Sequence, residues 1–351
     1  MRTIARRHAL RLPLGLLALA VLLGPVTAGA AQVIKLGTIA PEGSPWHDGL
    51  LELAQRWREI SGGRIDLRIY PGGVSGDEPD MIRKMRIGQL HAAALTTVGL
   101  TTVVPDIEAL AFPTVVHSDA ELDQIIRRVG PVIEGQLAAK GFKVLNWSSA
   151  GWVRIFAREP VVTVADLQRQ KLFVWGQDAA YMELLRKTGM NPIPLAITDL
   201  LPSLETGLVN AFAAPPAAAL AFQWFALAKH MTDFRWQPMV GTTVVSMKTW
   251  QAIPEPLRGE LEQAAHEGGA RLLQKSRALE QEAIRVMQQH GLVVHEVPPP
   301  VAAEWRDVVR EKGLPVFVGP RFSQATFDAV QAALADYRAG HEAPAAGGAA
   351  P

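Results

Sequence analysis

The chain has no cysteine in its 351 residues. It therefore has no disulfide, no cysteine nucleophile and no cysteine that could carry a lipid behind a leader peptide. After the first 30 residues it also lacks any long apolar run, so we predict no membrane-spanning helix there. A chain of this length buries enough apolar surface to fold without disulfides.

Recognisable catalytic and metal-binding motifs are missing as well. The segment 73–77 lacks the second glycine of a Gly-x-Ser-x-Gly nucleophile elbow, and the glycines at 72, 73 and 76 lack the lysine of a phosphate loop. His266-Glu267 begins like a helical zinc motif, but Ala270 stands where the second histidine is required. We predict no catalytic residue, no metal site and no cofactor.

The first 30 residues are arranged like a secretory signal peptide. Arg2, Arg6, Arg7 and Arg11 precede an apolar run over 12–26, and small residues follow at 27–31. We predict cleavage and a soluble periplasmic product. An uncleaved signal anchor is the alternative, and the export route stays open between the general and twin-arginine pathways.

The charge of the remaining chain is close to balanced. Removing the four leader arginines from 35 basic residues leaves 31, against 34 acidic residues. A slightly acidic surface without basic blocks argues against nucleic acid as a partner.

Strand and helix patterns alternate along the rest of the chain. Residues 64–70 alternate apolar and polar side chains, residues 45–60 space apolar ones as a helix does, and residues 255–290 form a long amphipathic helix. This alternation predicts an α/β fold with mainly parallel sheets covered by helices. The Ala/Gly/Pro-rich residues 339–351 are predicted to be a disordered tail.

Aromatic composition is uneven, with nine tryptophans and only three tyrosines. Five tryptophans fall between residues 147 and 236: Trp147, Trp152, Trp175, Trp224 and Trp236. Burial in the core is the ordinary interpretation for each of them. The alternative is a ligand cleft with aromatic walls.

From residue 33 to about 305 the chain resembles the solute-binding proteins of tripartite ATP-independent periplasmic (TRAP) transporters. The resemblance rests on short features in a fixed order. These occupy residues 34–37, 44–46, 62–65, 71–73, 87–90, 112–113, 141–145, 159–160, 164–167, 171–175, 189–194 and 204–211.

The resemblance implies a two-domain periplasmic-binding-protein-like fold with crossing strands and a long helix beside the hinge. We expect domain I to comprise 32–148 with 236–253, and domain II 149–235 with 254–338. Such proteins close on a small organic ligand and deliver it to membrane permease subunits. The same fold as a ligand sensor for a membrane receptor is an alternative, and a periplasmic hydrolase is a further one.

Two departures from the family pattern concern the ligand. Phe173 stands where the family usually has an arginine that binds a carboxylate through two parallel hydrogen bonds. Ala213 and Ala214 stand where the family has glutamate and asparagine. A carboxylate facing Phe173 would lose charge-assisted bonds and remain desolvated.

Two hypotheses follow for the ligand, which is either a hydrophobic compound or an organic anion. In the preferred one it is apolar or amphipathic and contacts Phe173, Trp175, Phe212 and Pro215, as in the family branch with a tetratricopeptide-repeat partner. In the other, Arg154 holds an anion, unless Arg154 is simply a surface residue of a strand. The complete set of predicted ligand-binding residues adds Trp46, Thr96, Ala213 and Trp236.

Overall fold

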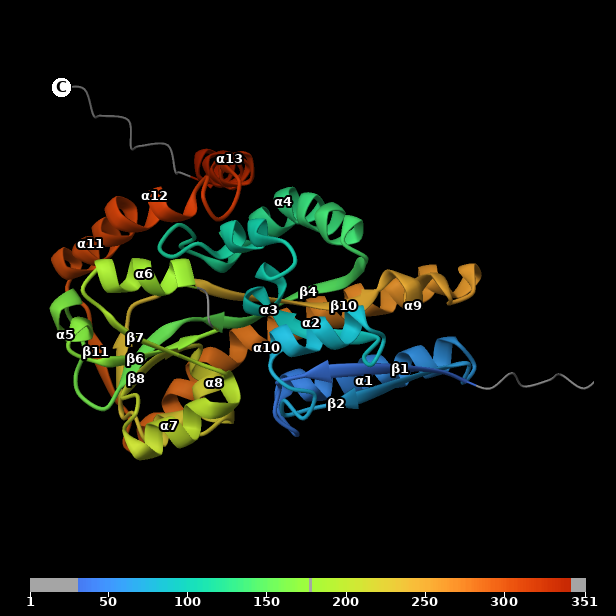
Figure 1. Ribbon diagram of the computed structural model, residues 1–351, viewed down its shortest axis with the longest axis horizontal. Coiled ribbons are helices and arrows are strands. Elements are labelled where there is room, and N and C mark those ends of the chain that lie inside the picture. The colour runs from blue at the N-terminus through green and yellow to red at the C-terminus, as the bar shows by residue number, and fades with distance from the viewer. Residues whose placement is uncertain (1–30, 177–178, 342–351) are drawn as a thin grey trace, which may run out of the picture.

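The protein contains two β-sheets, each covered by helices on both faces (Figure 1). The computed structural model describes residues 31–176 and 179–341. The predicted leader (1–30) and the predicted tail from residue 342 onward lie outside the described residues.

The first sheet has the order β2-β1-β3-β10-β4. Its strands are β1 (Gln32–Thr38), β2 (Ile65–Tyr70), β3 (Ala92–Thr96), β4 (Phe142–Trp152) and β10 (Pro238–Ser246). Helices α1 (Pro45–Ile60), α9 (Met247–Gln251) and the first half of α10 (Glu255–Gln289) cover one face. The other face is covered by α2 (Glu78–Arg86), α3 (Thr97–Thr101), η1 (Pro105–Ala111) and α4 (Asp119–Ala139).

The second sheet has the order β11-β9-β5-β8-β6-β7. Its strands are β5 (Arg154–Ala157), β6 (Lys171–Trp175), β7 (Asn191–Leu195), β8 (Ala211–Ala214), β9 (His230–Asp233) and β11 (Val293–Glu296). One face packs against η2 (Ile197–Asp199), α7 (Leu200–Thr206), α8 (Pro216–Ala221), η3 (Trp224–Ala226) and the end of α10. The other face packs against α5 (Val164–Gln168), α6 (Ala179–Lys187) and α11 (Pro299–Val308).

The predicted α/β class is confirmed, and both sheets are mixed. Of the nine neighbouring strand pairs in the described residues, five are parallel and four antiparallel. The antiparallel pairs involve β10 in the first sheet and β5 in the second, which are strands of the two crossings between the sheets.

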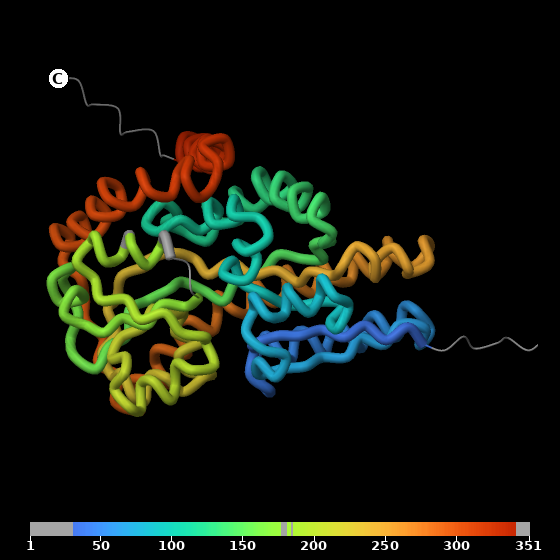
Figure 2. Tube along the Cα trace, in the orientation of Figure 1, coloured from blue at the N-terminus to red at the C-terminus, as the bar shows by residue number. Residues whose placement is uncertain are grey.

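Two crossings of the chain join the sheets side by side (Figure 2). One crossing passes from β4 through Val153 into β5, and the other from β9 into β10. The amide of Val153 donates to the carbonyl of Gln237 at 2.8 Å, and the amide of Trp236 donates to the carbonyl of Val153 at 3.1 Å. The crossings are thus bonded to each other where a hinge between the domains would lie.

Helix α10 passes along both domains as the predicted long helix. Its first half packs on α1 and β4, and Met287 near its end is buried in the core of the second domain. Gly269 allows the close approach to β4, because a Cβ there would lie 2.6 Å from the Cβ of Asn146 and 2.9 Å from the carbonyl oxygen of Trp147. A side chain at this position would push the helix away from the sheet.

The C-terminal segment returns from the second domain to the first. Trp305 of α11 is buried in the second domain, where its Nε1 donates to the carbonyl of Val162 at 2.9 Å. After η4 (Val309–Gly313, a π-helical turn) and α12 (Leu314–Phe317), helix α13 (Gln324–His341) packs on α4 of the first domain. This differs from the predicted grouping of 254–338 with the second domain.

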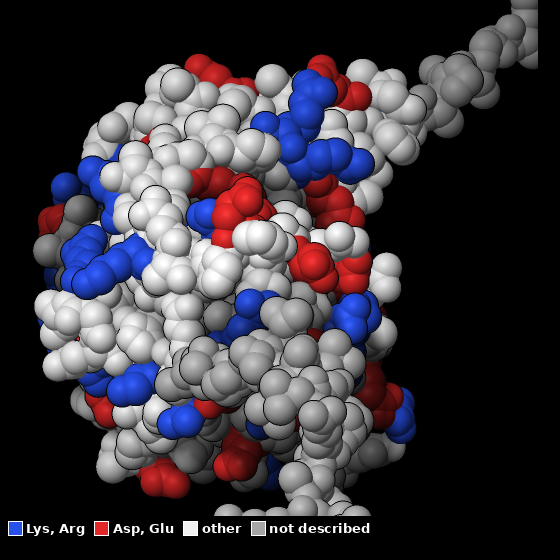
Figure 3. Space-filling model, turned by 90° about the vertical axis from the view of Figure 1, so that its right-hand side faces the viewer, with Lys and Arg blue, Asp and Glu red and all other residues white. Residues whose placement is uncertain are grey.

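Helix α13 also continues through His341, three residues into the predicted tail. None of the helices in the described part of the chain combines the length and the apolar character needed to cross a membrane. On the face shown in Figure 3, basic and acidic side chains are interspersed, as the near-balanced net charge leads one to expect.

Candidate functional site

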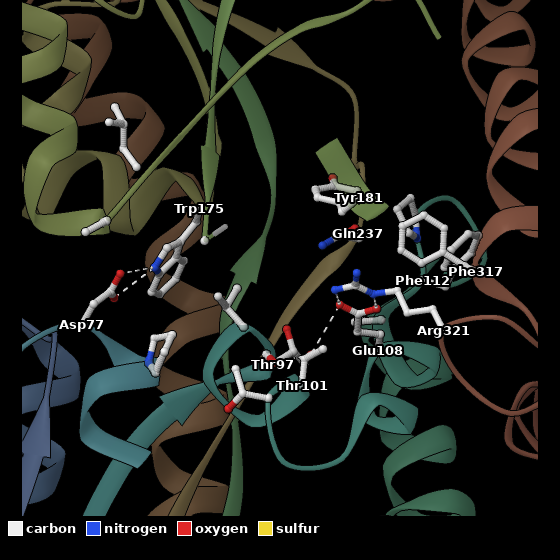
Figure 4. Close-up of a pocket in the computed structure, with 18 of the residues that line it drawn as sticks. Asp77, Thr97, Thr101, Glu108, Phe112, Trp175, Tyr181, Gln237, Phe317 and Arg321 are labelled. Carbon is white, nitrogen blue, oxygen red and sulfur yellow. Dashed lines mark hydrogen bonds and ion pairs between the residues drawn. The ribbon is translucent and has the colours of Figure 1, made fainter. Parts of the chain in front are cut away.

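The larger of two described cavities has a volume of about 650 Å³ and lies between the domains (Figure 4). The first domain contributes the start of α2, helix α3 and the end of η1. The second domain contributes the carboxyl ends of β6 and β7 and the start of α6. Ligands in α/β proteins commonly occupy this position, at the carboxyl ends of strands and at a domain boundary.

At one end of the cavity a hydrogen-bonded bridge joins the two domains. Trp175 ends β6, and its Nε1 donates to both carboxylate oxygens of Asp77 at 3.0 Å. The amide of Ile197, also in the second domain, donates to the same carboxylate at 3.3 Å. Asp77 is at the same time the N-cap of α2, accepting from the amide of Glu78 at 2.8 Å.

The floor of the cavity is α3, which presents Thr97, Val98 and Thr101. Glu78 fixes the start of this helix, because its carboxylate accepts from the amide of Thr96, the hydroxyl of Thr96 and the amide of Gly99, each at 2.9 Å. Glu78 is fully buried, and this burial raises its pKa to about 7 despite those bonds. A Cβ at Gly99 would lie 2.7 Å from that of Glu78, so the approach requires glycine.

At the other end, Arg321 and Glu108 form an ion pair under an aromatic wall. Arg321 donates through Nε to Oε2 of Glu108 and through Nη2 to Oε1 at 2.7 Å. Its guanidinium lies 5.8 Å from the ring centroid of Tyr181 and 5.4 Å from that of Phe317. Burial, with a smaller contribution from Glu108, raises the pKa of Tyr181 to about 12, so this phenol is neutral at physiological pH.

The second cavity, of about 110 Å³, lies at the hinge side of the cleft. Its walls come from the ends of β1 and β3, from β4 and β10, and from α1, α8 and α10. Trp46 and Thr96 are among the lining residues, which are mostly apolar. This cavity is smaller than the pockets that usually hold a drug-sized ligand.

The structure places three of the nine predicted ligand-binding residues at the cavities: Trp175 at the larger one, and Trp46 and Thr96 at the smaller one. Phe173 and Phe212 are instead buried in the core of the second domain, where Phe212 stacks on Phe156 at 5.1 Å.

The other predicted residues do not line either cavity. Pro215 is buried, Ala213 is exposed, and Trp236 packs edge-on against Trp305 at 5.7 Å. Like Phe173 and Phe212, these three residues therefore form no part of the wall of either cavity.

Arg154 lies neither on the surface nor at a cavity. It is 2% exposed, and its Nη2 donates to Glu280 of α10 at 2.9 Å while its Nε donates to Asp233 at 3.3 Å. Burial lowers the pKa of Arg154, and the carboxylate of Glu280 opposes that effect. Arg154 is thus buried and paired next to the crossings between the domains, which corrects both sequence-based interpretations of it.

Sequence reasoning missed Asp77, Glu108, Tyr181 and Arg321 as cavity residues. Asp77 is visible only as an acid at a helix start, which ordinarily indicates a cap. Glu108 and Arg321 stand 213 positions apart, and no local pattern connects them. In the described parts of the chain, no group of three or more His, Asp or Glu side chains could hold a metal ion.

Residues 36–313 match the model of the bacterial extracellular solute-binding proteins, family 7. The chain belongs to this family. A family 7 relative, the C4-dicarboxylate-binding periplasmic protein DctP of Rhodobacter capsulatus, is 22% identical over 336 residues, which are 94% of this chain and 99% of the relative. A solute-binding protein of Chromohalobacter salexigens is 24% identical over 277 residues, 77% of this chain and 81% of the relative.

Solved structures agree with the fold. A TRAP periplasmic solute-binding protein of Ralstonia eutropha, with bound (S)-2-acetolactate, superposes with a TM-score of 0.81 at 21% identity, covering 87% of this chain and 99% of that one. Another, from Ochrobactrum anthropi, has a TM-score of 0.75 at 26% identity, covering 89% of this chain and 97% of that one; there the C-terminus occupies the ligand-binding pocket.

These comparisons confirm the predicted membership of the TRAP-type solute-binding proteins and the two-domain fold. The relatives are binding proteins of transport systems, which agrees with the prediction of a non-enzymatic role and not with a hydrolase.

Proposed function

We propose that this family 7 protein captures an uncharged small organic ligand, apolar or amphipathic, in the 650 Å³ cavity and passes it to TRAP permease subunits. The proposal rests on how the basic side chains near the cleft are replaced or paired with carboxylates. Phe173 replaces the arginine expected in β6, Arg154 pairs with Glu280 and Asp233, and Arg321 pairs with Glu108.

Charges on the cavity wall support the same view. The ionised side chains among the described lining residues are Asp77, Asp80 and Glu108 against Arg321. An incoming carboxylate would meet more negative than positive charge and would have to compete with Glu108 for the arginine. Solved relatives have succinate, β-D-glucuronate or orotic acid bound. These ligands are organic acids, whereas the ligand that we propose for this protein is uncharged.

Capture by closure of the two domains explains how such a ligand is held. We place the hinge at the bonded crossings near Val153 and Trp236, close to the predicted domain borders. The bridge from Asp77 to Trp175 and Ile197 then belongs to the closed form, because it joins the two sides of the cleft. We further propose that the partner is a membrane permease, with a tetratricopeptide-repeat protein as an additional one.

The proposal is tested by thermal unfolding of protein that has been stripped of ligand by unfolding and refolding. The panel contains organic acids, amino acids, fatty acids, sterols, isoprenoids and neutral ring compounds. A ligand at about a thousand times its Kd stabilises the fold by roughly 4 kcal/mol. We expect stabilisation by uncharged compounds only, whether apolar or amphipathic, accompanied by compaction in small-angle scattering. Stabilisation by small carboxylates would contradict the proposal.

A further inference from the structure

The C-terminal strap, which we define as residues 309–322, crosses from the second domain to the first (Figure 1). It contributes Phe317 and Arg321 to the cavity lining. Before it, α11 is anchored in the second domain by the buried Trp305. After it, α13 is anchored on the first domain, where Asp106 accepts from the hydroxyls of Ser323 and Thr326 at 2.8 Å and 2.7 Å. The strap is therefore a further connection between the two domains, in addition to the two strand crossings and helix α10.

The strap is shaped by bonds within itself. The amides of Arg321 and Phe322 both donate to the carbonyl of Phe317, at 3.0 and 3.1 Å, and the amide of Gly319 donates to the carbonyl of Phe322 at 2.8 Å. Gly319 has a φ of +90°, a conformation that a side chain would strain. This tight loop fixes where Phe317 and Arg321 stand relative to the cavity.

The side chains of Phe317 and Arg321 both face the cavity, and each contacts residues of the first and of the second domain (Figure 4). The ring of Phe317 packs edge-on against Phe112 of the first domain at 5.3 Å and against Tyr181 of the second at 5.6 Å. Arg321 binds Glu108 of the first domain and lies over the ring of Tyr181. One end of the cavity is consequently formed by a wall of three rings, those of Phe112, Tyr181 and Phe317. Beside this wall lies the ion pair of Arg321 and Glu108.

This wall is partly built from residues that the family model does not cover, because the match ends at residue 313. Phe317 and Arg321 follow that limit.

We infer that the strap determines ligand specificity, with Phe317 contacting the ring of an uncharged, ring-bearing organic molecule. The inference rests on the proposed function and names the ligand class for the same cavity. Rings pack well edge-on or offset against other rings, and the wall offers Phe112, Tyr181 and Phe317 for such contact. Because Arg321 is paired with the carboxylate of Glu108, this end of the cavity is unsuited to an anionic ligand.

A matched pair of substitutions tests the inference. Phe317 lines the cavity, whereas Phe322, which packs against the same Phe112 at 5.7 Å, does not. Wild-type protein, Phe317→Leu and Phe322→Leu are titrated calorimetrically with 2-phenylacetamide and with phenylacetate, which differ mainly in charge. We expect the wild type to prefer the amide, Phe317→Leu to weaken amide binding by about 3- to 10-fold, and Phe322→Leu to change it by less than about twofold.

Each contrary outcome has a definite meaning. Equal weakening by both substitutions would show that the strap only stabilises the fold, and the specificity role would be wrong. Preference of the wild type for phenylacetate would overturn the uncharged class. If the only neutral compounds of the panel that bind are ones without a ring, the ring-bearing class is wrong and the proposed function stands. If no panel compound binds, the proposed function itself fails.

Discussion

Glu78 illustrates how one buried acid shapes the floor of the cavity. Its carboxylate bonds to Thr96 and Gly99 and thereby holds α3 against α2. Desolvation nevertheless dominates, so the folded protein binds a proton at this site more tightly than the unfolded chain does. Stability and the geometry of the floor are therefore linked to pH through this residue.

The sign of that linkage gives a prediction. The pKa is about 7 in the folded state against 4.5 for an ordinary glutamate, so Glu78 contributes most to stability below about pH 4.5, and that contribution is lost as the pH rises to about 7. Relative to Glu78→Gln, which does not titrate, wild-type protein should lose about 2–3 kcal/mol between pH 5 and pH 8. Urea unfolding at both values measures this, and parallel pH profiles of the two proteins would refute it.

The sequence indicated which residues differ from the family pattern, but it did not indicate how deeply each of them is buried. It recognised that Phe173 departs from the family pattern, but it placed the ring at the ligand. In the structure α7, α8 and η3 cover this face of β6, and only Trp175, at the strand end, reaches the larger cavity. Arg154 and Glu280 are 126 positions apart, so their pairing was invisible before the chain was folded.

At the scale of helices and strands, the sequence predicted an element reliably where apolar residues recur with the spacing of that element. The helix expected at 255–290 is observed as Glu255–Gln289. The apolar segment 217–228 is split into α8 and η3, because Gln223 adopts a left-handed φ of +60° between them. Uniformly apolar segments carry no periodic signal that could reveal such a break.

Two glycines of α10 have opposite roles, which a pair of alanine substitutions separates. Gly269 touches β4, and Gly259 has nothing within 4 Å of a Cβ. We expect Gly269→Ala to destabilise the protein by about 1–3 kcal/mol through overpacking. Gly259→Ala should stabilise it by up to about 1 kcal/mol through helix propensity. Chemical unfolding distinguishes them, and a neutral Gly269→Ala would mean that α10 is not pressed against β4.

At the scale of the whole molecule, opening the cleft requires the loss of the bridge at Asp77. Trp175→Phe keeps a ring but removes the N–H that bonds to Asp77. Hydrogen bonds to a charged group are worth about 1.5–3 kcal/mol, so the closed form should lose about tenfold or more in population relative to the open one. Small-angle scattering of stripped protein should show a larger radius of gyration than for the wild type.

Trp224→Phe is the control for this experiment. Trp224 is buried in the core of the second domain against Phe212 and Phe222, and it neither lines a cavity itself nor takes part in the bridge to Asp77. This variant should scatter like the wild type. An unchanged radius for Trp175→Phe would show that the bridge does not hold the domains together.

The return of α13 to the first domain has a consequence for biogenesis. Helix α4 ends at Ala139, but α13, which covers its apolar side, begins only at Gln324. A chain that is synthesised from its N-terminus onward therefore exposes part of α4 until nearly its whole length is available for folding. The first domain is completed last, so its folding depends on contacts between distant segments, and such contacts slow folding and prolong the exposure of apolar surface.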